Sequence, residues 1–160
     1  MNNDTVSAPE PGLRTNVGIM ITNRQGRVMA GEAFHYPGEW LMPQGGVGLD
    51  ETLLDAVQRE LFEESGLHAR EMEMIRELDE WITYDFIKPQ LKDGIMYRGQ
   101  RQQWFLFSHD GLLPECPVVE NQEFSRFAWV EPAWLVEHTT PMLNQVYYQV
   151  FRAFQAYFPD

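Results

Sequence analysis

Cysteine is nearly absent: Cys116 is the only one in 160 residues, so no disulfide can form within the chain. That usage is compatible with a reducing compartment, and we expect a cytoplasmic location. No apolar run approaches the roughly 18 residues that a membrane-spanning helix needs, so no membrane partner is expected. The opening residues lack the basic and apolar parts of a secretory signal. Residues 1–12 are therefore predicted to be a flexible lead-in.

Positive charge is also scarce, with 12 Lys and Arg residues against 24 Asp and Glu residues and a net charge of −12. A long nucleic-acid footprint needs many basic contacts to phosphates, so no extended nucleic-acid footprint is expected. One segment departs from this pattern, because Lys88, Lys92, Arg98 and Arg101 lie close together in the sequence. It is either a phosphate-binding segment or a solvated loop, and charge alone favours neither.

The remaining composition is typical of a globular protein, with 44% hydrophobic and 13% aromatic residues. The length suits one domain with a substantial core, which we place at residues 13–160 and expect to be a monomer. Apolar runs and turn residues predict strands at 16–21, 27–30, 71–78, 81–86, 102–107 and 124–130. A further short apolar run covers residues 40–42.

A helix is predicted over residues 51–65, because Leu54, Val57 and Leu61 fall on one stripe and Gly66 suits a left-handed C-terminal cap.

Two more helices are predicted near the C-terminus. Pro132 opens a short one, and Pro141, with Thr140 as N-cap, opens a longer one. The longer helix carries an apolar stripe that we assign to the core and not to a ligand site: Leu143, Val146, Tyr147, Val150, Phe151, Phe154 and Phe158. The order of elements predicts an α/β fold with a mixed sheet between helices.

Three carboxylates on the first helix form the clearest candidate site. Glu60, Glu63 and Glu64 fall within an arc of about 100° at the edge of the apolar stripe, where like charges repel one another. A divalent cation would remove that repulsion, and oxygen ligands without His or Cys indicate Mg²⁺, with Mn²⁺ able to substitute. A Glu-rich surface helix that binds nothing is the alternative.

The surroundings of the helix favour the metal site over that alternative. Glycines at 45, 46 and 48 allow a tight turn that offers carbonyl groups to a metal and leaves room for phosphates. Arg59, four residues before Glu63, can orient a carboxylate.

These residues together resemble the Nudix box, whose register is matched without a gap by Gly45, Glu51, Arg59, Glu60, Leu61, Glu63, Glu64, Gly66 and Leu67. The resemblance implies the Nudix α/β/α sandwich and hydrolysis of a pyrophosphate bond in a nucleotide-type substrate. It also implies that Arg59 belongs to the catalytic set and braces the loop with Glu51. The implied metal ligands are the Gly45 carbonyl and the carboxylates of Glu60, Glu63, Glu64 and Glu123.

The resemblance extends over nearly the whole domain to one Nudix branch, the bacterial RNA 5′-pyrophosphohydrolases and plant-type dinucleoside polyphosphate hydrolases. It is carried by the segments 14–19, 40–46, 81–86, 98–107 and 121–124. By this resemblance, polyphosphate would be received by Arg14, Lys92 and Arg101, and Tyr84 would stack on a base or ribose. A strand aromatic packed on the core is the alternative for Tyr84, and an ordinary loop glutamate is the alternative for Glu123.

Three positions depart from the branch. Glu32 lies near a position where bacterial members carry one of two consecutive arginines, Gln103 replaces a lysine, and Met142 replaces a base-contacting aromatic. Fewer cations and one lost aromatic weaken the RNA interpretation more than the pyrophosphohydrolase one.

Three hypotheses follow. The first is removal of pyrophosphate from the 5′ end of triphosphorylated RNA. The second is hydrolysis of dinucleoside polyphosphates such as diadenosine tetraphosphate. The third is a catalytically silent module that senses nucleotides.

Overall fold

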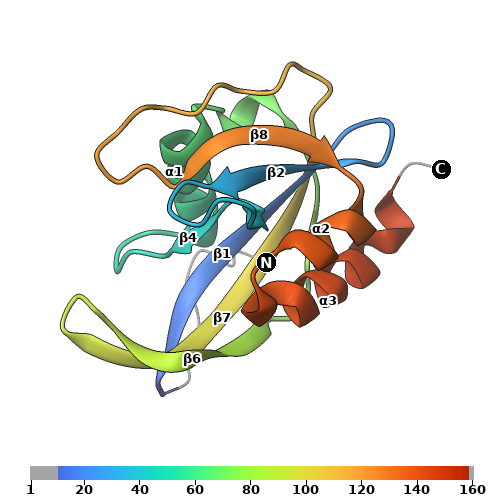
Figure 1. The fold of residues 1–160 in the computed structure, drawn as a ribbon. Coiled ribbons are helices and arrows are strands. Elements are labelled where there is room, and N and C mark those ends of the chain that lie inside the picture. Colours follow the sequence, from blue (N-terminus) through green and yellow to red (C-terminus); the bar gives the residue numbers. More distant parts are fainter. Residues whose placement is uncertain (1–10, 159–160) are drawn as a thin grey trace.

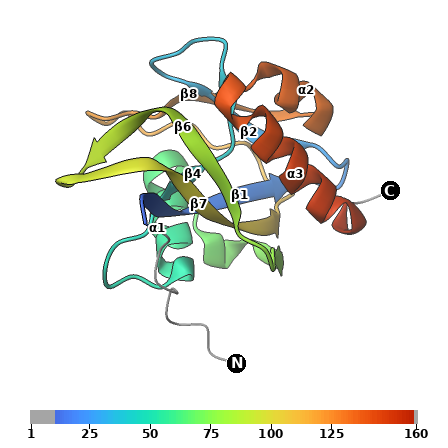
Figure 2. The same cartoon turned by 90° about the horizontal axis from the view of Figure 1, so that it is seen from below.

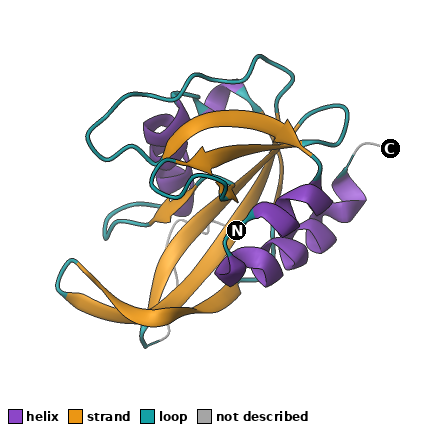
Figure 3. Cartoon of the chain, in the orientation of Figure 1, coloured by secondary structure: helices purple, strands orange, loops and turns teal. Residues whose placement is uncertain are grey.

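A mixed β-sheet forms the centre of the computed structural model, which describes residues 11–158 (Figures 1 and 3). Its two longest-paired strands, β1 (Leu13–Thr22) and β7 (Ile95–Ser108), run parallel in a continuous register from Leu13 opposite Gly99 to Thr22 opposite Ser108. The strand order is β3-β2-β1-β7-β5, with β4 on β1, β6 on β7 and β8 on β2. The other strands are β2 (Val28–Ala33), β3 (Trp40–Leu41), β4 (Gln44–Gly46), β5 (Glu73–Glu77), β6 (Ile82–Lys92) and β8 (Phe124–Val130).

Helices cover both faces of this sheet, as Figure 2 shows from below. Helix α1 (Leu53–Ser65) packs on one face, and α2 (Pro132–His138) and α3 (Asn144–Phe154) pack on the other. Short 3-10 turns are η1 (Ala69–Glu71), η2 (Pro141–Leu143) and η3 (Gln155–Tyr157). The predicted α/β fold with a sheet between helices is therefore confirmed.

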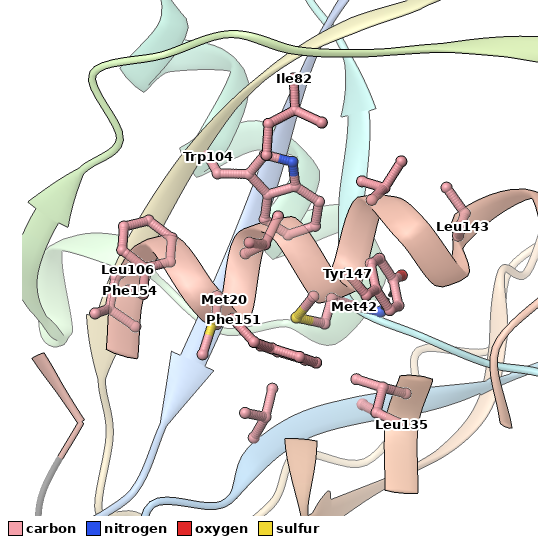
Figure 4. Packing of buried hydrophobic residues seen from close by; sticks show 14 of the residues in the cluster. Met20, Met42, Ile82, Trp104, Leu106, Leu135, Leu143, Tyr147, Phe151 and Phe154 are labelled. Atoms are coloured by element: carbon pink, nitrogen blue, oxygen red, sulfur yellow. Dashed lines mark hydrogen bonds between the residues drawn. The ribbon is translucent and has the colours of Figure 1, made fainter. Parts of the chain in front are cut away.

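The core consists of two clusters, one on each face of the sheet. The α3-side core contains the buried residues of the predicted C-terminal stripe, with Trp104 and Tyr147 fully buried and their rings edge to face (Figure 4). The α1-side core contains Leu53, Val57 and Leu61 of α1. They pack with residues of β1 and β7 that alternate along each strand with the residues of the α3-side core. The assignment of the aromatic stripe to the core is confirmed.

Helix α1 differs from its prediction at the N-terminus and on its buried face. It begins at Leu53, not at residue 51, because Thr52 caps it and forms a reciprocal capping box with Asp55. Leu54 is 44% exposed, so its assignment to the apolar stripe was wrong; Ala56 is buried in its place. The left-handed cap is confirmed, with Gly66 at φ 78°.

Other boundaries also shift. The Thr140 side chain accepts no capping hydrogen bond, and η2 occupies the first turn, so α3 begins at Asn144. The expected strand at 71–78 is shortened to β5 by η1, whereas β6 and β7 extend beyond 86 and before 102 into a long hairpin. Of the predicted lead-in, residues 1–10 lie outside the described residues. Gly12 is already fixed, because its carbonyl accepts from the Arg98 N–H at 2.8 Å.

Candidate active site

Arg59 connects helix α1 to the glycine-rich segment before it. Its Nε and Nη2 donate to the two oxygens of Glu51 at 2.7 and 2.8 Å, and Nη2 also donates to the Gly46 carbonyl at 2.8 Å. Glu51 in turn accepts from the Gly48 N–H at 2.7 Å. Hydrogen bonding from Arg59 therefore lowers the pKa of Glu51. The result is a braced loop whose position relative to α1 is fixed.

The three α1 glutamates differ in environment. Arg59 Nη1 lies 2.7 Å from Glu60 Oε1 and 3.4 Å from Glu63 Oε2. The side chain of Glu63 is 56% exposed, and that of Glu60 is 14% exposed. Glu64 is 8% exposed, and its Oε2 has no hydrogen-bond partner within the described residues. Burial raises the pKa of both Glu60 and Glu64, and for Glu64 the charge of Glu60 adds to the effect.

Gly45 of β4 lies directly against this cluster. A Cβ at position 45 would lie 1.9 Å from the Glu60 carboxyl carbon, so a side chain there would displace the Glu60 carboxylate. Position 46 points the other way, because a Cβ there would lie 2.3 Å from Arg14 Nη2. Since consecutive strand residues face opposite sides, Glu60 and Arg14 lie on opposite faces of β4.

A fourth carboxylate joins the cluster from the loop at residues 109–123, which passes beside α1 (Figure 1). Glu123 lines, together with Glu60, Glu63 and Glu64, a cavity of about 700 Å³. The Glu123 charge contributes to the raised pKa of Glu60 and Glu64. The position of Glu123 is held by its backbone carbonyl, which accepts from the Phe34 N–H at 2.9 Å. The loop residue is thus brought to the helix carboxylates.

This donor set suits a hard divalent cation. It offers only oxygen atoms, and the unpartnered, buried Glu64 Oε2 is the kind of acceptor that a cation would satisfy. Among residues 11–158, no three His, Cys, Asp or Glu side chains are already arranged to hold a metal ion together. Mg²⁺ commonly binds through one or two carboxylates completed by water and substrate phosphate, so an open arrangement fits it.

The predicted substrate-binding residues lie on β1, β6 and β7 and are not part of the described cavity lining. The Tyr84 hydroxyl lies 3.1 Å from Gln100 Oε1, and burial raises the pKa of Tyr84 to about 12. Arg101 donates to Thr15 Oγ1 at 3.1 Å and lies over the Trp81 ring at 4.2 Å.

Lys92 is exposed at the end of β6, and Arg98 pairs with Asp85 at 2.6 Å. The cationic segment therefore belongs to the β6–β7 hairpin, with two of its basic residues on each strand, and is not a loop.

A buried amide network was not anticipated from the sequence. Gln102, which is fully buried, donates to Asn16 Oδ1 at 2.8 Å and to Gln44 Oε1 at 2.9 Å, and accepts from Trp104 Nε1 at 3.1 Å. Gln44 begins β4, and its backbone lowers the pKa of the Glu64 carboxyl against the larger effect of burial. Amide side chains at three strand positions, two of them buried and Gln44 half-buried, are the signal that could have revealed this support next to Gly45.

An α/β sandwich that presents clustered glutamates beside a glycine-rich strand is suited to a hydrolase that acts on phosphates with a divalent cation. The family model described as NUDIX domain matches residues 12–154, and the chain belongs to the Nudix family of enzymes that hydrolyse pyrophosphate bonds.

The chain is similar in sequence to both plant and bacterial proteins. It is 36% identical to Nudix hydrolase 27, chloroplastic, of Arabidopsis thaliana, over 98% of this chain and 72% of that protein. It is 38% identical to an RNA pyrophosphohydrolase of Roseobacter denitrificans, over 90% of this chain and 92% of that protein.

Solved structures share the fold at low sequence identity. The Escherichia coli dihydroneopterin triphosphate pyrophosphohydrolase superposes with a TM-score of 0.66 at 16% identity, covering 86% of this chain and 95% of that one. A Caenorhabditis elegans Ap4A hydrolase complex gives 0.63 at 17% identity, covering 91% and 100%. No helix among the described residues is long and apolar enough to cross a membrane.

Proposed function

We propose that this enzyme removes pyrophosphate from the 5′ end of triphosphorylated RNA and leaves a 5′-monophosphate. The observation that carries the proposal is the 38% identity to an RNA pyrophosphohydrolase along 92% of that protein's length. The site's chemistry is consistent with it. The Glu60 carboxylate, which would bind a cation, lies against Gly45 of β4, and Arg14, a phosphate-binding side chain, lies against Gly46.

The residues that would hold Mg²⁺, or Mn²⁺ in its place, are Glu60, Glu63, Glu64, Glu123 and the Gly45 carbonyl. The cation would neutralise charge on the bridging and terminal phosphate oxygens and lower the pKa of a bound water. Hydrolysis adds the water oxygen to phosphorus while the bridging oxygen leaves with pyrophosphate, and a carboxylate of this cluster accepts the proton released. Arg59 keeps Glu60 and the loop in place through the bonds described above.

Dinucleoside polyphosphate hydrolysis is the second candidate function. The sequence resembles a branch that includes plant-type dinucleoside polyphosphate hydrolases, and a solved protein that shares the fold is an Ap4A hydrolase. Both candidate substrates join a nucleoside to a polyphosphate, so one site can accept either. A silent nucleotide sensor, the third hypothesis, does not account for four clustered glutamates, because their repulsion is costly unless a cation is bound.

The deciding experiment compares turnover of a triphosphorylated RNA oligonucleotide and diadenosine tetraphosphate at equal concentrations with Mg²⁺. We expect kcat/KM to be at least about tenfold higher for the RNA, and chelation of the metal to abolish both reactions. A preference of that size for diadenosine tetraphosphate would assign the enzyme to the second function instead.

A further inference from the structure

One wall of the catalytic cavity is apolar, which the hydrolysis of a phosphate chain does not require. Besides the carboxylates, the cavity is lined by Phe62 of α1 and by Pro117 and Val119 of the loop at residues 109–123. Phe62 is 51% exposed and Val119 is 54% exposed. Phosphate oxygens seek cations and N–H donors, so this wall suits another part of a substrate.

Phe62 is held as a platform. Its ring stacks on His68 with centroids 4.8 Å apart and planes 25° from parallel. Phe62 lines the cavity whereas His68 does not, and Phe62 remains half exposed. An aromatic ring fixed in this way is a surface on which any nucleobase can stack. Asn121 and Gln122, which line the same cavity, add amide groups that can pair with base edges.

The position of this wall separates it from the expected nucleotide-binding residues. Glu60 lies on one face of β4 and Arg14 on the other, and neither Arg14 nor Tyr84 belongs to the described cavity lining. Phe62 and the carboxylates line the same cavity, so a polyphosphate bound at the carboxylates has this wall beside it. A molecule with a nucleoside at each end of its polyphosphate can place one of the two bases against the wall.

We propose that the wall formed by Phe62, Pro117 and Val119 is a second nucleobase subsite. It takes the base at the far end of a dinucleoside polyphosphate, with Phe62 as the stacking residue. The proposal rests on the proposed function to the extent that the phosphates are cleaved at the neighbouring carboxylates. A triphosphorylated RNA end has no nucleoside on that side, so its hydrolysis does not use the subsite.

The test measures KM and kcat of Phe62→Ala on diadenosine tetraphosphate and on a triphosphorylated RNA oligonucleotide. Loss of one base–aromatic stack should raise KM for diadenosine tetraphosphate roughly 5-fold or more, with kcat changed little and the RNA reaction unchanged. Phe62→Trp should restore the wild-type KM. Tyr148→Ala is the matched control, because Tyr148 is 54% exposed on α3, away from the cavity.

Unchanged KM for diadenosine tetraphosphate, or an equal rise for both substrates, would overturn the subsite. The outcome is independent of the proposed function. Wild-type enzyme that fails to hydrolyse the RNA would refute that function, whereas a Phe62 effect confined to diadenosine tetraphosphate would still support the subsite.

Discussion

Glu64 is the carboxylate whose environment departs most from water. The residue is 8% exposed, and Oε2 has no hydrogen-bond partner among the described residues. Burial is the main cause that raises the pKa of Glu64 well above 4.5, and the charges of Glu60 and Glu123 raise it further. Above pH 4.5, the unfolded chain loses this proton before the folded protein does. The folded state then binds more protons than the unfolded state, so stability falls as pH rises through that interval.

The metal-free protein should therefore lose stability as the pH rises. Its free energy of unfolding should decrease from about pH 4.5 upward until the pH passes the raised pKa of Glu64. In Glu64→Gln the decrease should be smaller, because the variant side chain carries no charge. Denaturant titrations in the presence of a chelator measure both slopes. Identical slopes would mean that Glu64 is not buried as an unpaired acid in the metal-free protein.

Glu123 should act on turnover more than on affinity. It lines the cavity with the α1 glutamates, and if it holds the metal or the attacking water, its removal affects the transition state more than the bound substrate. We expect Glu123→Ala to lower kcat by about 100-fold or more with a small change in KM. Glu120 lines the same cavity, so Glu120→Ala is the control. A reversed result would transfer the role to Glu120.

At the scale of elements, strand β4 depends on the buried amide of Gln102. Gln102→Leu leaves acceptors on Asn16 and Gln44 and the Trp104 N–H without a partner, at a cost of about 1–3 kcal/mol. It should also lower kcat, because Gln44 directly precedes Gly45 on β4 and its backbone influences the pKa of Glu64.

The matched control is Gln103→Leu on the same strand. Gln103 donates to the Leu78 carbonyl, so its loss should reduce stability while leaving kcat near the wild-type value. Thermal unfolding and steady-state kinetics of both variants separate the two effects. An equal loss of kcat in Gln102→Leu and Gln103→Leu would mean that Gln102 contributes only to the stability of the fold and does not position the site.

Local patterns predicted the elements better than their ends and their pairing. The helical spacing of α1 and its Gly66 cap could be predicted from the sequence, because both depend on residues close to one another in the chain. The exposure of Leu54 was not, because the direction of the buried face is set by β1 and β7. The outer half of the β6–β7 hairpin escaped notice, since its exposed residues show no apolar alternation.

In the candidate site, too, residues close together in the sequence could be predicted, whereas contacts between distant segments could not. The α1 glutamates and Arg59 lie within one motif and were predicted together. Gln102 was missed because its partner Asn16 is 86 residues away, and that separation is closed only by the parallel pairing of β1 with β7.

For the whole molecule, the net charge of −12 limits how much RNA can be bound productively. We expect a triphosphorylated dinucleotide or trinucleotide to bind nearly as tightly as a 20-mer, because further phosphates meet an acidic protein. Each neutralised phosphate contributes about −0.7 to the slope of log K against log salt on a single strand, so that slope should be small. Titrating both lengths with a catalytically inactive variant at about 50 to 200 mM salt tests this. Tighter, strongly salt-dependent binding of the 20-mer would require an extended basic track.

In our proposal, the carboxylates of α1 form the active site that hydrolyses the pyrophosphate bond, and Glu63→Gln tests this central claim most directly. The measurement is release of pyrophosphate from triphosphorylated RNA at saturating Mg²⁺, beside Glu71→Gln, which changes the same residue type on η1. We predict that Glu63→Gln loses about 100-fold or more of its turnover. Its metal-free stability should be equal or slightly higher, because repulsion with Glu60 and Glu64 falls, and Glu71→Gln should match the wild type. Near-wild-type turnover by Glu63→Gln would contradict the assignment of this helix as the active site.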